Sequence, residues 1–285
     1  MKKILVLFAL VVSGMWLGCQ KPAQPDTEAW ISLFNGVNLD GWIPKISHYP
    51  VGENFGETFQ VKDSSLVVRY NAYDTFNARY GHIFYKEPFS YYIIELDYRF
   101  TGAQVAGGED WALRNSGIMV HGQAVESMQK DQDFPISIEV QLLGGLGQGP
   151  RSTANLCTPG THVVMADTLL TQHCISSRSK TYDGEQWVHV RVEVYGDSLI
   201  RHVVEGDTVL QYSKPQVGGE VVNGFDPAVK IDGQLLTSGT ISLQSESHPV
   251  EFKNIRLLNL CGCTDPKAKN YKSYFLIPSP QSCVY

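Results

Sequence analysis

The sequence predicts an all-β fold, a sandwich or jelly roll of roughly a dozen antiparallel strands. Three observations favour it. Apolar and polar residues alternate with a period of two through much of the chain. No segment keeps a helical apolar stripe beyond a turn or two. The 26 Gly and 14 Pro residues supply many turns. A chain of 285 residues is long enough for one large β domain.

The amino terminus is typical of an export signal. Two lysines precede the apolar run Ile4–Val12, which is too short to span a bilayer. Gly18 followed by Cys19 is similar to a bacterial lipoprotein cleavage site, and plain secretion is the alternative. We therefore predict a signal peptide over 1–18 and a lipid-bearing tether over 19–29. The chain would be an exported lipoprotein, periplasmic or at the cell surface, that meets the membrane only through its lipid anchor.

The clearest strand signals lie in the middle of the chain. Every even position of Tyr91–Phe100 is apolar and most odd positions are polar, as in a half-buried strand. Val188–Tyr195 repeats the pattern, and Glu205-Gly206-Asp207 marks a later hairpin turn. The remaining predicted strands are Ile31–Phe34, Phe59–Val61, Leu66–Tyr70, His82–Tyr85, Ser116–His121, Ile136–Leu143, Leu199–Val204, Thr208–Tyr212, Thr240–Gln244 and Val250–Leu257.

Four long connections are predicted as loops, and loops of this length in a compact sandwich are often functional. The alternation ends at Leu260, so we predict one domain over 30–260 and a small disulfide-closed appendix over 261–285. The predicted loops are Ile43–Glu57, Gly102–Asn115, Gly144–Tyr182 and Lys214–Ser238.

Charge and cysteine content narrow the classes of function. The net charge is −6 and no basic stripe appears, which argues against a nucleic-acid partner. Export would place the cysteines in an oxidising compartment, where disulfides form. We predict the disulfides Cys157–Cys174 and Cys263–Cys283, with Cys261 left unpaired. A zinc site is the less favoured alternative, because the Cys-x-Cys pair has no second pair or His at the usual spacing.

The strand Ile136–Leu143 carries the most informative polar residues. Its apolar residues face one way, and Glu139 and Gln141 face the other. If the strand that contains His121 is a neighbour, His121, Glu139 and Gln141 converge on one open face. The alternative is an ordinary solvated face. A double-displacement glycosidase needs two carboxyl groups about 5 Å apart, so Glu-x-Gln disfavours that mechanism unless another strand supplies a carboxylate.

Two further clusters are candidates for binding. Gln244 and His248 lie in and after a predicted strand near the end of the domain; the alternative is a turn with polar tips. Trp111, Arg114 and Asn115 combine an aromatic ring, which stacks on sugar C–H faces, with donors for hydroxyl groups. A loop tryptophan that covers a core edge is the alternative here.

Several segments resemble one large bacterial family, the 3-keto-disaccharide or 3-keto-glycoside hydrolases. The resemblance covers about 30–260 and implies a concanavalin A-like lectin/glucanase jelly roll with its site on the concave face. It implies that the functional residues include Glu139, Gln141, Gln244, His248 and, more loosely, His121. The segments are Trp30-Ile31-Ser32-Leu33-Phe34-Asn35-Gly36, Leu39-Asp40-Gly41-Trp42, Asn115-Ser116-Gly117-Ile118, Glu139-Val140-Gln141 and Val250-Glu251-Phe252-Lys253-Asn254-Ile255.

The resemblance implies cleavage of small 3-keto-glycosides by removal of the C2 proton, elimination and hydration. Glu139 or His121 is the expected base and His248 the expected acid. Arg114 and Gln141 are expected donors, and no certain cofactor is expected. A divalent metal held by His121 and Glu139 could replace the donors. A non-catalytic, lectin-like carbohydrate-binding protein is the alternative function. The expected substrate-binding residues are Trp111, Arg114, Asn115, Gln141 and Gln244.

Overall fold

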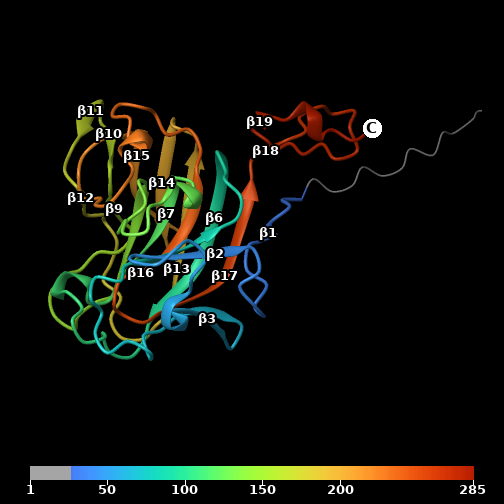
Figure 1. Cartoon of the computed structure of the whole chain (residues 1–285). Helices are drawn as coiled ribbons and strands as arrows, with labels where there is room; N and C mark the ends of the chain where they lie inside the picture. The colour runs from blue at the N-terminus through green and yellow to red at the C-terminus, as the bar shows by residue number, and fades with distance from the viewer. Residues whose placement is uncertain (1–26) are drawn as a thin grey trace, which may run out of the picture.

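The computed structural model describes residues 27–285. The predicted signal peptide, Cys19 and most of the tether lie outside the described residues. The described part is an all-β sandwich of two antiparallel sheets (Figure 1), so the predicted fold class is confirmed. Its only helical segments are short 3-10 turns, and none of these is long and apolar enough to cross a membrane.

The first sheet is built around the long central strand β6, Tyr91–Phe100. β6 pairs with β13 on one side and β17 on the other. The order is β11-β10-β15-β14-β13-β6-β17-β4-β3, and β1 also pairs with β17. The other strands are β1 Ile31–Ser32, β3 Phe59–Lys62, β4 Ser65–Val68, β10 Thr161–Met165, β11 Thr168–Leu170, β13 Val188–Tyr195, β14 Leu199–Val204, β15 Asp207–Val217 and β17 Val250–Asn259.

The second sheet contains the strands that carry most of the candidate residues. Its order is β12-β9-β8-β7-β16-β5-β2. The strands are β2 Trp42–Ile46, β5 Gly81–Tyr85, β7 Asn115–Gly122, β8 Ile138–Leu143, β9 Asn155–Cys157, β12 Cys174–Ile175 and β16 Thr240–Ser245. The 3-10 turns are η1 Phe55–Glu57, η2 Asp110–Ala112, η3 Val125–Ser127, η4 Pro227–Val229 and η5 Pro280–Ser282.

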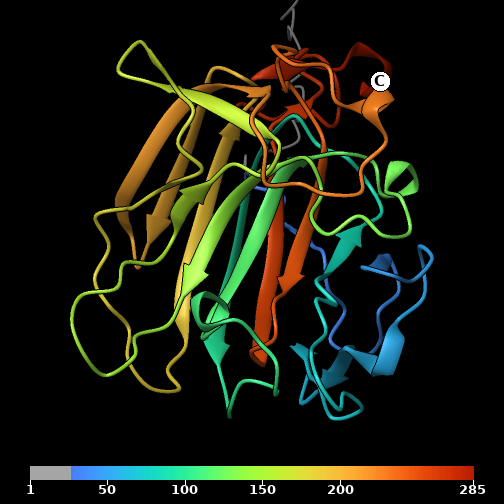
Figure 2. The ribbon, with the colours of Figure 1, turned by 60° about the vertical axis from the view of Figure 1, so that its left-hand side comes forward.

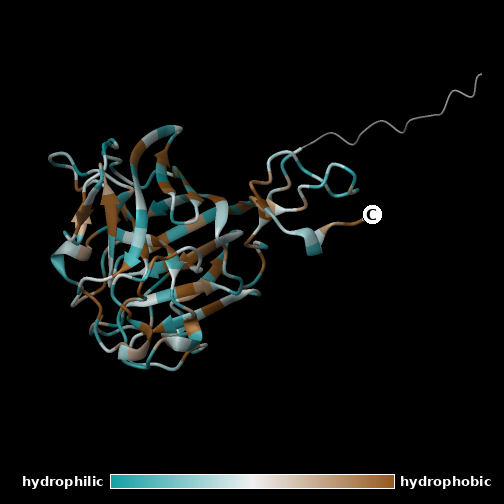
Figure 3. Cartoon of the chain, turned by 90° about the horizontal axis from the view of Figure 1, so that it is seen from above, coloured by the Kyte–Doolittle hydropathy of each residue, from teal (hydrophilic) through white to brown (hydrophobic). Residues whose placement is uncertain are grey.

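The core lies between the two sheets. Ile94 and Leu96 of β6 and Val190 of β13 are buried on the first sheet, and Ile118 and Val140 are buried on the second. Hydrophobic and hydrophilic residues alternate along the strands (Figure 3). This alternation fixes which side chains reach the outer face of the second sheet, because successive residues of a strand point to opposite faces.

Two predicted loops contain strands. All but the first residue of β2 lies within the predicted loop Ile43–Glu57, and the strands β9 to β12 lie within Gly144–Tyr182. Those four strands have only two to five residues, too few for a period to show. They form because neighbouring strands supply hydrogen-bond partners: β9 extends the second sheet from β8, and β10 extends the first from β15.

After β17 the chain leaves the sandwich. β18, Cys261–Gly262, pairs in parallel with β19, Ile277–Pro278. Both views place this tail at one end of the sandwich (Figures 1 and 2). The predicted disulfide Cys263–Cys283 is confirmed. Cys261 is free and half-buried.

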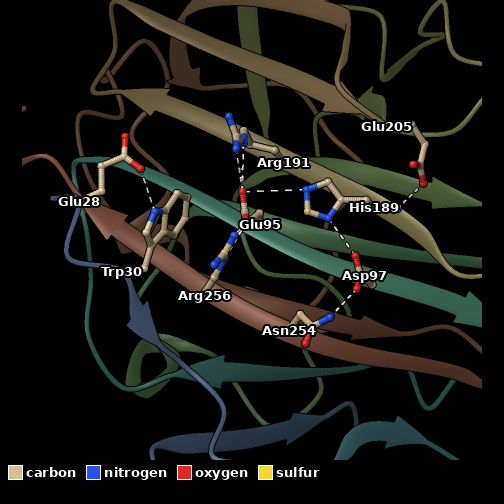
Figure 4. Close-up of polar contacts among 9 residues, drawn as sticks. All are labelled: Glu28, Trp30, Glu95, Asp97, His189, Arg191, Glu205, Asn254 and Arg256. Atoms are coloured by element: carbon tan, nitrogen blue, oxygen red, sulfur yellow. Dashed lines mark hydrogen bonds and ion pairs between the residues drawn. The ribbon is translucent and has the colours of Figure 1, made fainter.

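The outer face of the first sheet carries a paired polar network (Figure 4). Glu95, 2% exposed, accepts hydrogen bonds from Arg191 and Arg256. His189 and Asn254 both bond to Asp97, at 2.8 and 2.6 Å. No buried side-chain nitrogen or oxygen atom of this network lacks a partner. The network therefore stabilises the fold and leaves no buried polar atom free for a ligand.

Candidate active site

The predicted convergence of polar residues occurs on the outer face of the second sheet, where β8, β7 and β16 are neighbours. Glu139 of β8 and Gln244 of β16 extend toward each other over Gly117 of β7. A Cβ atom on Gly117 would lie 2.8 Å from Glu139 Oε1 and 3.2 Å from Gln244 Oε1. A side chain at this position would therefore push the carboxylate and the amide away from the space that they share above Gly117.

A pocket of about 320 Å³ opens on this face. Four sequence-predicted residues line it: Trp111, Asn115, Glu139 and Gln141. Its size and its few polar groups among apolar side chains suit a small-molecule site. The other lining residues are Phe134, Cys157, Pro159, His173, Cys174, Val221 and Glu246.

Glu246, which sequence reasoning did not select, brings a second carboxyl group into the pocket. Burial raises the pKa of Glu139 to about 8. Burial, and then the charge of Glu139, raises the pKa of Glu246 well above its usual value. No cation offsets either shift among the described residues. Two interacting carboxyl groups without a counter-charge cost stability, and such pairs cluster at catalytic sites.

Unpartnered polar atoms mark the same face. Glu246 Oε2, Asn115 Oδ1 and both amide atoms of Gln244 are buried without a hydrogen-bond partner, and so are both ring nitrogens of His82. Buried polar groups in proteins are nearly always paired, so a cluster of exceptions calls for an explanation. The paired network of Figure 4 on the opposite face makes the contrast clear. A ligand or ordered water must complete this site.

A disulfide forms one wall of the pocket. Cys157 of β9 lies opposite Glu139 in the sheet, and the predicted bond Cys157–Cys174 is confirmed. Cys157, His173 and Cys174 are also the one group of three His, Cys, Asp or Glu residues in the described chain whose ligand atoms lie within 4.8 Å of one another. The disulfide uses both thiols, so this group offers a metal no thiolate.

The pocket offers oxygen atoms that could hold a hard cation. The carboxylates of Glu139 and Glu246 and the amide oxygen of Asn115 are the ligand types that Mg²⁺ and Ca²⁺ prefer. The residues predicted for a metal, His121 and Glu139, do not come together, because their side chains leave the second sheet on opposite sides.

His121 is the clearest correction to the sequence analysis. Its φ of 50° breaks the strand alternation, and the pairing of β7 with β16 shifts register at this point. The ring turns toward the other sheet, where Nε2 lies 3.0 Å from the carbonyl oxygen of Gly196. Burial lowers the pKa of His121. The expected convergence of His121 with Glu139 and Gln141 is therefore wrong for His121.

Arg114 and His248 lie away from the pocket lining, around Phe100. The Arg114 guanidinium donates to the Gly184 carbonyl and lies 5.6 Å from the Phe100 ring centroid. The His248 ring lies 5.7 Å from the same ring. Burial lowers the pKa of His248 to about 4, and the charges of Arg114 and Arg151 add to the effect. A neutral His248 outside the pocket does not fit the expected acid.

Aromatic side chains form the mouth of the pocket. Trp111 is half-exposed and stacks with Tyr80, with ring centroids 6.0 Å apart. Tyr80 packs on Phe134 at 4.9 Å. Exposed aromatic faces of this kind stack on the C–H faces of sugar rings. Trp111 thus keeps its predicted place, while Tyr80 and Phe134 were missed because their loops bring them in from separate segments.

Comparisons with known proteins identify the family of this chain and proteins that share its fold. Residues 29–258 match the family of 3-keto-alpha-glucoside-1,2-lyase-like domains. No curated protein sequence matches the chain. A proposed glycosyl hydrolase from Parabacteroides distasonis has 19% identity over 81% of this chain and 93% of its own, with a TM-score of 0.50, and it shares the fold. The laminarinase from Rhodothermus marinus has 11% identity, 81% and 96% coverage and a TM-score of 0.46. The carbohydrate binding module CBM66 from Bacillus subtilis has 10% identity over 77% of this chain and 96% of its own, with a TM-score of 0.45.

Proposed function

The chain belongs to the family of 3-keto-alpha-glucoside-1,2-lyase-like domains, and from that membership we propose that it cleaves 3-keto-glycosides, either 3-keto-disaccharides or 3-keto-glucosides. The family makes it a carbohydrate-active, glycosyl hydrolase-like protein. The observation that supports the finer proposal is the pair of interacting carboxyl groups, Glu139 and Glu246, in a pocket of small-molecule size.

The proposed reaction needs one base and one acid. A ketone at C3 acidifies the C2 proton; a base removes it and leaves an enolate. The C1–O bond to the aglycone then breaks, and the departing oxygen takes a proton from the acid. Water adds across the C1–C2 double bond, with hydroxyl to C1 and a proton to C2. The products are the 3-keto sugar and the free aglycone.

The two carboxyl groups differ in the way that these roles require. Glu139 has its pKa raised to about 8, so it loses its proton within the working range of an enzyme and can act as the base. Glu246 has its pKa raised further once Glu139 is charged, so it keeps its proton and can donate it. Gln141 and Asn115 supply amide donors in the same pocket for the enolate oxygen.

The second carboxylate also favours a rival reaction. Glu246 follows the last residue of β16 and does not lie on the strand of Glu139. It supplies the second carboxyl group that a glycosidase acting on unoxidised sugars needs. A sugar-binding protein without turnover is the other alternative. Substrate comparison distinguishes the three.

The test uses three substrates: 4-nitrophenyl 3-keto-glucoside, a 3-keto-disaccharide and 4-nitrophenyl glucoside. We expect turnover of the two keto substrates alone. Glu139→Gln should lose about 10²–10⁴-fold on both. Glu246→Gln should lose about 10²-fold on the disaccharide but little on the nitrophenyl substrate, because nitrophenolate leaves without a proton. Glu126→Gln, at an exposed position outside the pocket, is the matched control.

Two results would contradict the proposal. Cleavage of the unoxidised glucoside at a similar rate would assign an ordinary glycosidase. Glycan binding without turnover of any substrate would assign a lectin-like protein.

A further inference from the structure

Three side chains beside the pocket are fully buried and unpartnered. Both ring nitrogens of His82, the hydroxyl of Ser242 and both amide atoms of Gln244 have no hydrogen-bond partner, and each side chain is 0% exposed. We call these three residues the buried polar row. Five unpaired atoms in one place are costly, since each lost its hydrogen bonds to water on folding.

The sheet register places the row on the pocket side of the second sheet. Gln244 of β16 lies directly opposite His82 of β5. Their neighbours Leu243 and Ile83 belong to the core between the sheets, so Ser242, Gln244 and His82 point to the outer face. Gln244 lies on the same face as Glu139, because the Oε1 atoms of both side chains lie within 3.2 Å of the place that a Cβ atom on Gly117 would take. The row therefore lies on the same face of the sheet as the pocket.

One aromatic ring separates the row from the pocket. Phe134 lines the pocket and packs edge-on against His82, with ring centroids 5.9 Å apart. Phe134 is half-buried and belongs to the connection between β7 and β8. Phe134 therefore contacts both the cavity and His82.

We propose that the buried polar row is the inner part of the ligand site, opened when Phe134 turns away, and that His82 and Gln244 hydrogen-bond neighbouring hydroxyl groups of a sugar ring. This inference rests on the proposed function, which makes the ligand a sugar. An imidazole and an amide on adjacent strands offer donors and acceptors about 5 Å apart at their Cβ atoms, a spacing that vicinal hydroxyl groups bridge. The row then recognises the ring, and the carboxyl pair performs the chemistry.

Stability and affinity should move in opposite directions when the row is made apolar. An unpartnered buried group destabilises the ligand-free protein, so His82→Leu should raise or preserve its melting temperature. The same change should raise KM for 4-nitrophenyl 3-keto-glucoside about tenfold, with kcat changed less. Ser242→Ala, which removes one hydroxyl group and adds no bulk, should also preserve or raise the melting temperature.

Tyr92→Phe is the matched control. The Tyr92 hydroxyl is buried and unpartnered too, but it lies in the core between the sheets. Its removal should preserve or raise the melting temperature and leave KM unchanged.

The result that overturns the inference is specific. If His82→Leu and Ser242→Ala lower the melting temperature and leave KM unchanged, ordered water fills the row and no ligand uses it. If the proposed function fails instead, the wild-type protein turns over none of the keto substrates. Calorimetric titration with methyl glucoside then tests the inner site by binding alone. Binding that His82→Leu weakens keeps the inner site, and binding that it leaves unchanged rejects it.

Discussion

Glu139 and Glu246 define the site at the scale of single residues. Strand alternation predicts that Glu139 leaves the core, and it does, but the pocket walls leave it only 6% exposed. Glu246 follows Gln244 by two residues, so alternation extended one step past the strand would have found it. His82 could not be found in this way. Gln244, which lies opposite it on the neighbouring strand, is far along the chain, and neither segment indicates which strands are neighbours. His121 was misplaced because a positive φ is invisible to periodicity.

The carboxyl pair predicts a pH dependence of activity. If Glu139 must lose its proton to act as base, kcat/KM on a 3-keto-glucoside should rise with pH through a midpoint near 8. Because the two groups interact, this midpoint belongs to the pair. Glu139→Gln should flatten the rising limb. A wild-type midpoint near pH 4 to 5 would show that the base is an ordinary exposed carboxylate.

The same titration should appear in stability. The folded-state pKa of Glu139 is raised, so between about pH 4.5 and 8 the folded protein holds a proton that the unfolded chain has lost. The contribution of Glu139 to stability is therefore highest below this window and falls across it, by at most about 1.4 kcal/mol per pH unit, and Glu246, whose pKa is also raised, adds a fall of its own. Glu139→Gln removes this slope and should be more stable than wild type at pH 8. Parallel denaturant titrations at pH 5 and pH 8 measure the difference.

At the scale of elements, the long strands were predictable and the short edge strands were not. β6 alternates from Ile94 to Phe100 and β13 alternates along its whole length, and both runs are long enough to show a period. β9 and β12 carry three and two residues, and their structure comes from pairing at the edge of a sheet. These edge strands matter for the site, since Cys157 and Cys174 form a wall of the pocket.

The wall disulfide should therefore affect substrate binding. The bond joins β9 to β12 and closes a loop with a sequence separation of 17. Cys157→Ala with Cys174→Ala should lower the free energy of unfolding by about 3 kcal/mol and raise KM, because the outer strand is no longer held. Cys263→Ala with Cys283→Ala is the matched control, since that bond lies in the tail. An unchanged KM in the first variant would show that pairing alone holds the wall.

At the scale of the whole molecule, the two outer faces of the sandwich differ in a way that composition does not reveal. The first sheet presents charges that satisfy one another, with Glu95 and Asp97 held by Arg, His and Asn side chains (Figure 4). The second presents carboxyl and amide groups without partners. Both faces are polar in the sequence, so only the paired or unpaired state of their atoms identifies the site.

The tail beyond the sandwich should be dispensable for turnover. None of its described residues lines the pocket. Its hydrogen bonds to the rest of the chain are few; among them, the amides of Leu276 and Ile277 donate to the carbonyl oxygen of Leu260, and the amide of Cys261 donates to Asn259 Oδ1. A chain ending at Leu260 should keep kcat/KM on a 3-keto-glucoside within about twofold. Its melting temperature should fall modestly, because Leu260 loses its cover. If the shortened chain melts as a folded protein but no longer turns over any keto substrate, the tail completes the site, and the pocket at the second sheet cannot be the whole of it.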